Sequence, residues 1–378
     1  MSSNTDRRSF LALGAGALAA PALASPALAW AAGDPIASMI VVNALGGLEN
    51  PNDPTKRDRP FLDARALADA RASGQTAVNV TIGYVSGPDE PFEYSVREVA
   101  QWDKLVRDHP KDLLKVMSAA DILRAKAEGK TGLIYGFQNA AMMGKDASRV
   151  DIFADLGVKI IQLTYNPANQ LGDGSMAPEN RGITPFGREV IERLNANRVM
   201  VDLSHSGQQT CLEAARFSKR PISINHTGCR AVTDLPRNKT DEELRLVAEK
   251  GGFVGIYFMP FLNPTGHARA ADVVAHIDHA VNICGEDHVG IGTDGGTSQI
   301  DDLKAYESRL AEEIAKRRAS GISATGERPD TYPFVVDLRG PDQFRKLAGL
   351  LRERGYSTTR IEKILGQNFV RHAQEIWG

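Results

Sequence analysis

Cysteine is scarce in this sequence of 378 residues, and the three that occur show no C-x-x-C spacing. An odd number without that spacing indicates neither a disulfide framework nor a structural zinc knuckle; whether two of Cys211, Cys229 and Cys284 pair in an oxidising compartment stays open. Long runs of lysine and arginine are absent too, and the formal net charge is −2. Because nucleic acids and anionic membranes bind basic surfaces, we expect a small-molecule partner and no nucleic acid.

Long apolar runs are confined to the N-terminus. Arg7-Arg8-Ser9-Phe10-Leu11 precedes an alanine-rich run that ends near Ala20, and the small residues Ala27 and Ala29 offer an A-x-A cleavage site. This pattern is typical of a twin-arginine export signal, which we place at residues 1–32. The run is shorter than the roughly 20 residues of a spanning helix, and an uncleaved anchor is the alternative. We predict a periplasmic or secreted protein with no membrane span after signal removal.

The rest of the chain alternates short apolar or β-branched segments with longer segments of helical periodicity, which is typical of βαβ units around a parallel sheet. Strands are predicted at 39–43, 76–82, 132–137, 158–163, 199–203, 221–225, 253–257 and 289–292. Helices are predicted between them at 62–72, 95–108, 119–128, 184–196, 207–216, 241–249 and 272–283. No G-x-G-x-x-G follows the first strand, which argues against a dinucleotide-binding fold.

Eight strands with helical crossovers favour an α/β fold of the closed (β/α)8 TIM barrel type. Residues 33–378 form one domain in this interpretation, because no composition shift or repeat marks a second. Residues 300–333 are charged and are predicted to be irregular, and terminal helices are predicted at 340–351 and 358–378.

Polar residues stand where several predicted strands end, and in such a barrel the loops at those ends line the concave face. His205 and His226 end consecutive strands, so two imidazoles can converge there as ligands of an ion such as zinc, or be hydrogen-bonded loop residues. Asp294 ends the last strand and is a general base, a metal ligand or a helix cap. Arg230 lies four residues after His226, where it binds a substrate carboxylate or stands on the surface.

The motifs around these residues resemble the membrane (renal) dipeptidase family, peptidase family M19. The resemblance extends from about Ile40 to Arg371 and rests on Gly182-Ile-Thr-Pro-Phe-Gly-Arg-Glu189, Val201-Asp-Leu-Ser-His205, Asn225-His226 to Arg230, Asp234-Leu-Pro-Arg-Asn238, Asp287-His-Val-Gly-Ile-Gly-Thr-Asp294 and Leu365-Gly-Gln-Asn-Phe-Val-Arg371. It implies a metal-dependent-hydrolase barrel with two zinc ions that cleaves dipeptides. By the same resemblance His205 and His226 are ligands of the second zinc, Arg230 binds the dipeptide carboxylate, and Asp294 handles the proton.

The sequence departs from the family at the other zinc ion. Leu45 and Gly47 replace the His-x-Asp pair of the first strand, and Gln138 replaces the bridging Glu. Tyr165 stands in place of a His near the substrate, and Tyr257 substitutes for a polar aromatic, so both are predicted to contact substrate. Two cations repel strongly without anionic ligands. We therefore expect one zinc ion at most, with His205, His226 and weakly Gln138 as ligands, or none.

Two functions follow from this pattern. The first is a dipeptidase-like metallohydrolase that cleaves a dipeptide or related amide with a metal-bound water as the nucleophile and Asp294 as acid and base. The second is an altered or inactive homologue that acts as a periplasmic binding or maturation protein. The partner is a dipeptide-like small molecule in both, and a homodimer stays open.

Overall fold

The computed structural model describes residues 33–53, 55 and 59–378. The predicted export signal lies outside the described residues, so it stays a prediction. No helix within the described residues is both long and apolar enough to span a membrane.

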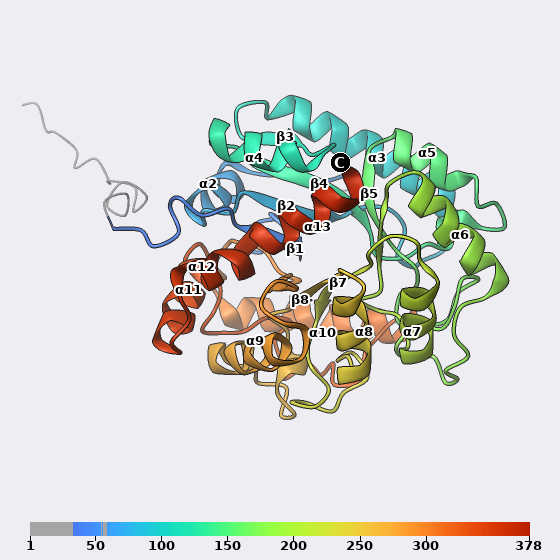
Figure 1. Cartoon of the computed structure of the whole chain (residues 1–378). Helices are drawn as coiled ribbons and strands as arrows, with labels where there is room; N and C mark the ends of the chain where they lie inside the picture. The colour runs from blue at the N-terminus through green and yellow to red at the C-terminus, as the bar shows by residue number, and fades with distance from the viewer. Residues whose placement is uncertain (1–32, 54, 56–58) are drawn as a thin grey trace, which may run out of the picture. The chain divides into compact units, whose positions relative to one another are not determined.

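One parallel sheet organises the chain, in the strand order β1-β2-β4-β5-β6-β7-β8-β9, with β3 paired to β4 (Figure 1). The strands are β1 (Val42–Gly46), β2 (Ala77–Thr81), β3 (Leu113–Lys115), β4 (Thr131–Phe137), β5 (Val158–Gln162), β6 (Met200–Asp202), β7 (Ser223–Thr227), β8 (Phe253–Ile256) and β9 (Val289–Ile291). All eight predicted strands are present. β4 is buried along its whole length, as expected of a parallel strand covered on both faces.

The two edges of the sheet meet at the ends of β1 and β9. Asn43 accepts a hydrogen bond from the backbone N–H of Thr293 at 2.8 Å and donates one to its hydroxyl at 2.8 Å. The backbone N–H of Asp294 donates to the carbonyl of Leu45 at 2.9 Å. These bonds nearly close the barrel and confirm the (β/α)8 prediction. They also bring Asp294 beside the first strand, although about 250 residues separate them.

Helices surround the sheet, and their boundaries follow local sequence signals. They are α2 (Ala64–Ala72), α3 (Pro91–Asp108), α4 (Ala119–Glu128), α5 (Arg149–Asp155), α6 (Pro185–Ala196), α7 (Gln208–Phe217), α8 (Asp241–Glu249), α9 (Ala270–Cys284), α10 (Leu303–Ala319), α11 (Gln343–Glu353), α12 (Thr358–Glu362) and α13 (Asn368–Trp377), with short turns η1 (Ala141–Met143), η2 (Pro260–Leu262) and the π-helical η3 (Lys363–Gln367). Thr240 and Glu243 form a capping box that starts α8. Gly129, at φ 66°, ends α4.

Helix α13 closes the end of the barrel opposite the strand termini that carry the site. Phe369, Ile376 and Trp377 of α13 share an apolar cluster with residues from several strands, among them Val42 and Phe253. The predicted C-terminal helix is thus present as α12, η3 and α13. This end is filled by side chains, which leaves the other end for chemistry.

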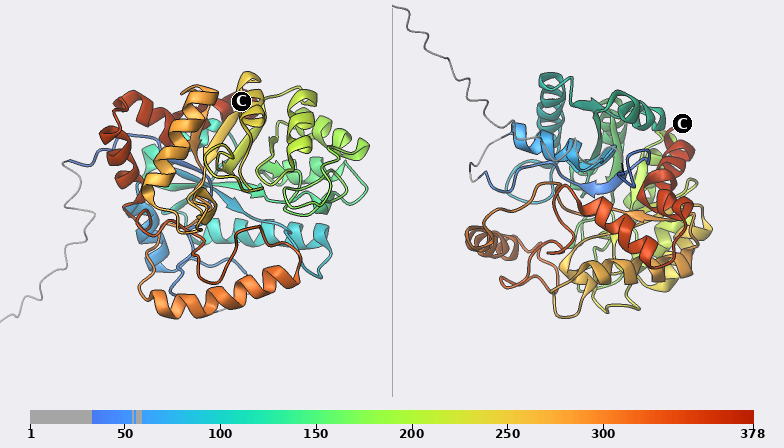
Figure 2. Two further views of the ribbon diagram at one scale, coloured as in Figure 1. Left: turned by 90° about the horizontal axis from the view of Figure 1, so that it is seen from below. Right: turned by 90° about the vertical axis from the view of Figure 1, so that its left-hand side faces the viewer.

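The prediction of an irregular segment at residues 300–333 is wrong for residues 303–319, which form α10. Only Leu310 and Ile314 of this helix are buried. The sequence therefore lacks the apolar stripe by which a helix is recognised. The short β3 and α5 were also not predicted. Figure 2 shows α10 on the side of the molecule away from α11 and α13.

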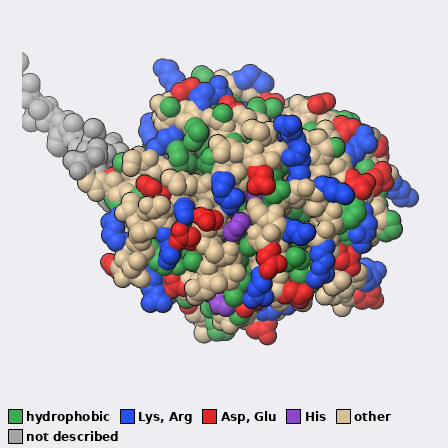
Figure 3. Space-filling model, viewed as in Figure 1, with side chains coloured by type: hydrophobic (Ala, Val, Ile, Leu, Met, Phe, Trp, Pro, Cys, Tyr) green, Lys and Arg blue, Asp and Glu red, His purple; other side chains and the backbone are tan. Residues whose placement is uncertain are grey.

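Acidic and basic side chains are interspersed over the face seen in Figure 3. This distribution agrees with the net charge of −2. The three cysteines are buried and free.

Candidate active site

A cavity of about 250 Å³ lies where the strands end, and α10 with the loop that follows it forms one of its walls. Its lining includes Gln138, Tyr165, Met259, Asp294, Arg317 and Glu327. The barrel contributes the first four of these residues, and the segment predicted to be irregular contributes the last two. The cavity is therefore assembled from both parts of the chain.

His205 and His226 are brought together beside this cavity. Their Nε2 atoms are 2.9 Å apart, and both side chains are buried. Burial, together with the nearby Arg237, holds the pKa of both imidazoles well below the ordinary value, so they are neutral at pH 7. The structure thus brings the two strand-end histidines together, and their role as metal ligands stays a prediction.

Hydrogen bonds determine the proton positions on His205. The Nη2 atom of Arg237 lies 3.2 Å from His205 Nε2, and because a guanidinium only donates, this nitrogen accepts. The proton therefore sits on Nδ1, which donates to Asn166 Oδ1 at 2.7 Å. His226 donates from Nε2 in turn, and its Nδ1 atom is buried without a hydrogen-bond partner.

Asp294 stands at the mouth in the left-handed backbone conformation, at φ 56°. A non-glycine residue adopts this region rarely, and Asp is among those that do. Its half-buried side chain lines the cavity. Desolvation raises the pKa of Asp294 to about 6, against the opposing effect of Arg237 and Arg317. Such a carboxyl group exchanges a proton near neutral pH.

Tyr165 connects the histidines to α10. Its ring stacks on His205, with 4.2 Å between the ring centres, and its hydroxyl lies 3.3 Å from Nη2 of Arg317. Arg317 also forms an ion pair with Glu327 at 2.7 Å. Burial raises the pKa of Tyr165, so its hydroxyl keeps its proton as a donor.

Neither Arg230 nor Arg237 lines the cavity, and the Arg230 guanidinium faces the exposed Asp234 at 3.7 Å. Arg237 takes the position next to the histidines instead. It is 2 % exposed and donates to the carbonyl of Ser204 at 2.6 Å as well as to His205. Arg237 belongs to the quoted motif at residues 234–238, but nothing in the spacing distinguished it from Arg230. Only the path of the loop does so.

Of the two predicted site residues Tyr257 and Gln138, only Gln138 lines the cavity. Tyr257 is fully buried beneath the site, and its hydroxyl donates to Asn238 at 2.5 Å; Met259 lines the cavity two residues later. Gln138 does line the cavity, and its amide nitrogen donates to the hydroxyl of Thr81 at 2.7 Å. Tyr257 thus supports the loop rather than facing the cavity.

The residues present fit one metal ion better than two. Both Nε2 atoms can serve as ligands of a single ion once the His226 proton moves to Nδ1 and Arg237 releases His205 Nε2. At the positions of the other ion, Leu45 is buried and apolar, and a Cβ atom at Gly47 would lie 2.3 Å from Glu49 Oε2. The space of a ligand at position 47 is thus already filled. Within the described residues, no group of three His, Cys, Asp or Glu side chains is arranged to hold an ion.

Comparisons with known proteins identify the family of this chain. The pattern of the membrane dipeptidase family (Peptidase family M19) matches residues 87–325. The dipeptidase tcpJ of Claviceps purpurea is 29% identical over 334 residues, which cover 85% of this chain and 71% of tcpJ. The crystal structure of an amidohydrolase from Pseudomonas aeruginosa is 32% identical, with a TM-score of 0.77, and the match covers 91% of this chain and 98% of that one.

The fold alone is shared with a metallopeptidase of Rhodobacter sphaeroides, whose structure holds a phosphinate mimic of the dipeptide L-Ala-D-Ala. That chain is 20% identical, with a TM-score of 0.70, over 90% of this chain and 99% of its own. Because the family pattern matches more than half of the residues, and the strand-end histidines and Asp294 stand together at the barrel mouth, this chain belongs to the membrane dipeptidase family, peptidase family M19.

Proposed function

We propose that this protein hydrolyses small dipeptide-like amides in the cavity at the barrel mouth, with Asp294 as the group that moves the proton. The observation that carries this proposal is the Asp294 carboxyl group, which lines the cavity and has a pKa raised by burial to about 6. Membership of the family implies a small peptide substrate and a metal cofactor. The protein is thus a dipeptidase-like hydrolase.

We propose one zinc-like ion, which His205 and His226 would hold. When bound, the ion supplies a Lewis acid that polarises the amide carbonyl and activates water. Two neutral imidazoles whose Nε2 atoms lie 2.9 Å apart support a single ion, and the lack of ligating side chains at Leu45 and Gly47 argues against a second. Gln138, Tyr165 and Asp294 are the polar residues of the lining that stand at strand ends.

Asp294 accepts the proton of the attacking water and delivers it to the departing amine. Its carboxylate is the major form at pH 7, since its pKa of about 6 lies below that pH. The protonated form is nevertheless accessible within the catalytic cycle, because the pKa of about 6 is close to pH 7. One side chain can therefore serve as base and then as acid.

Arg237 is the guanidinium that we assign to the substrate carboxylate, in place of Arg230. It is buried, and no carboxylate of the described residues forms an ion pair with it. A buried cation needs an anionic partner. Because Arg237 Nη2 lies 3.2 Å from His205 Nε2, a dipeptide seated at the histidines presents its carboxylate to this group.

Metal analysis and a dipeptide hydrolysis screen on the purified protein test this proposal. We expect turnover of at least one dipeptide and about one zinc-like ion per chain, with both lost in His205→Ala. The matched control is His279→Ala, which removes a half-buried histidine that contacts Asp241 on the outer helices. This control should keep the ion and the activity.

Absence of both metal and turnover at micromolar enzyme would refute the hydrolase. Two tightly bound ions would instead contradict the single-ion site. In that case the loop after β1, where Glu49 fills the space beside Gly47, would have to rearrange.

A further inference from the structure

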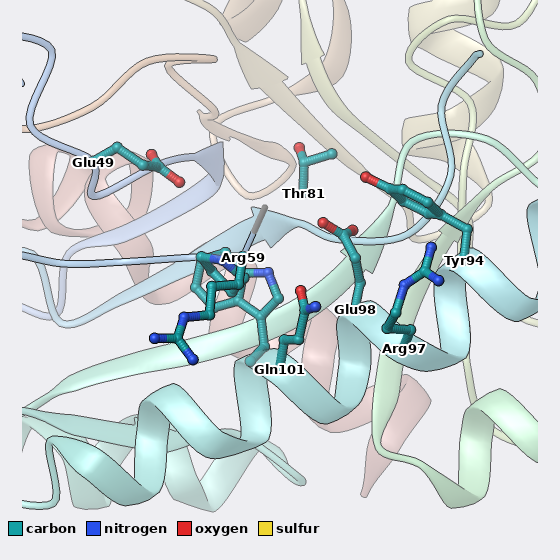
Figure 4. A pocket seen from close by; sticks show the side chains of 9 residues that line it. Glu49, Arg59, Thr81, Tyr94, Arg97, Glu98 and Gln101 are labelled. Atoms are coloured by element: carbon teal, nitrogen blue, oxygen red, sulfur yellow. The ribbon is translucent and has the colours of Figure 1, made fainter. Parts of the chain in front are cut away.

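A second and larger cavity, of about 690 Å³, opens at the same end of the barrel, and we call it the α3 cavity. It lies between the loop after β1, the end of β2 and one face of α3 (Figure 4). Glu49, Thr81, Tyr94, Glu98 and Trp102 are among its lining residues. None of these side chains has a role in the proposed reaction.

The α3 cavity and the candidate active site share a wall. Thr81 lines the α3 cavity, Gln138 lines the active-site cavity, and the amide of Gln138 donates to the Thr81 hydroxyl at 2.7 Å. The two cavities are therefore neighbours, and this hydrogen-bonded pair lies between them. The two cavities can hold two ends of one substrate.

Glu98 is the main charged group at the inner end of the α3 cavity. It is half-buried, its Oε2 atom accepts the backbone N–H of Gly83 at 2.5 Å, and the Tyr94 hydroxyl hydrogen-bonds to it. Burial raises the pKa of Glu98 against the opposing effect of its hydrogen bonds to Gly83 and Tyr94 and of the nearby Arg97. No basic side chain of the described residues forms an ion pair with it.

Two acidic side chains reach into the α3 cavity, whereas its two arginines lie at the exposed rim. In Figure 4 the carboxylates of Glu49 and Glu98 approach the cavity from opposite sides. Arg97 is exposed and lies over the Tyr94 ring, 5.7 Å from its centre, and Arg59 is exposed as well. Solvent screens exposed charges more than half-buried ones. The Trp102 ring, which also lines the cavity, adds an aromatic surface that can attract a cation.

We propose that the α3 cavity binds a positively charged side chain carried by the amino-terminal residue of the substrate, so that the protein selects dipeptide-like molecules with an ammonium or guanidinium group at that end. This assignment rests on the proposed function for the position of the scissile bond. The substrate carboxylate lies at Arg237, and the cationic end extends past Gln138 and Thr81 to Glu98. The two ends of the site thereby have opposite charge preferences.

The inference is tested by measuring how tightly the mature protein binds two matched dipeptides. Lysyl-alanine and norleucyl-alanine have side chains of equal carbon length, but only the first carries a terminal amine. We expect calorimetric titration at low salt to give an affinity at least ~10-fold higher for lysyl-alanine. In Glu98→Gln this ratio should fall below ~3-fold, because the amide oxygen still accepts from Gly83 while the charge is gone.

Glu93→Gln is the control, since Glu93 is an exposed acid on the first turn of the same helix and is outside the cavity. It should keep the full ratio. Equal affinities of the wild type for the two dipeptides, binding of neither, or equal losses in Glu98→Gln and Glu93→Gln would each overturn the inference.

Hydrolysis of the same two dipeptides separates this inference from the proposed function. A preference for lysyl-alanine in binding without turnover supports the α3 cavity and refutes the hydrolase. Turnover of both dipeptides with no preference supports the hydrolase and refutes the cationic site.

Discussion

Replacement of Asp294 by Asn is expected to lower kcat for dipeptide hydrolysis by about 10²–10⁴-fold, the usual contribution of a positioned acid or base. Asn keeps the size of the side chain and tolerates the left-handed backbone at φ 56°. The fold should therefore persist while proton transfer is lost. Steady-state kinetics on a dipeptide identified by the screen measures the effect, and circular dichroism checks the fold.

The activity should also depend on pH, and the pKa of Asp294 sets the direction of that dependence. The pKa of Asp294 is raised to about 6 by desolvation, so the carboxylate that acts as base is lost as pH falls through that value. In the wild type, kcat/KM should drop about tenfold per pH unit below pH 6. The residual activity of Asp294→Asn should lack this limb.

Glu312→Gln is the control for Asp294→Asn, because it removes an exposed negative charge on α10 outside the cavity lining. Its kinetics should match the wild type. A loss of less than tenfold in Asp294→Asn, or an unchanged acidic limb, would show that another group moves the proton.

Lys239→Met is expected to lower the free energy of unfolding by about 3–5 kcal/mol, as is typical when one partner of a buried ion pair is removed. Lys239 and Glu243 lie 3.3 Å apart, and each side chain is 2 % exposed. Lys239 also donates to the carbonyl of Ser206, next to His205. The variant leaves a buried carboxylate unpaired and releases the loop that holds the histidine. Denaturant unfolding measures the change.

The double variant Lys239→Met with Glu243→Gln should recover most of this loss, since no buried charge then remains and Gln still completes the capping box of α8. The surface control is Arg216→Met, which breaks a pair with Glu242 whose side chains are 53% and 59% exposed. It should cost less than about 1 kcal/mol. Equal costs for Lys239→Met and Arg216→Met would contradict the prediction.

Much of the fold could be predicted from local pattern, and the exceptions have physical causes. The spacing of apolar residues shows which face of each strand or helix is buried. This pattern is enough to predict the eight barrel strands. Helix α10 buries only Leu310 and Ile314, so it has almost no such pattern. Its contribution of Arg317 and Glu327 to the cavity was therefore missed.

At the site, the local pattern of the chain is enough to predict which side chains stand at strand ends. Parallel strands end at one rim, so His205, His226 and Asp294 had to meet there. The loss of ligands at Leu45, Gly47 and Gln138 was implied by the resemblance to the family, whose motifs can be aligned with this sequence.

Long-range packing places Arg237 rather than Arg230 at the histidines, and it places Glu49 in the space beside Gly47. The same holds for the pKa of Asp294 and for the wall shared by the two cavities. These features depend on how loops distant in sequence pack against one another. Desolvation and charge separation are properties of that packing, and no local pattern in the chain encodes them.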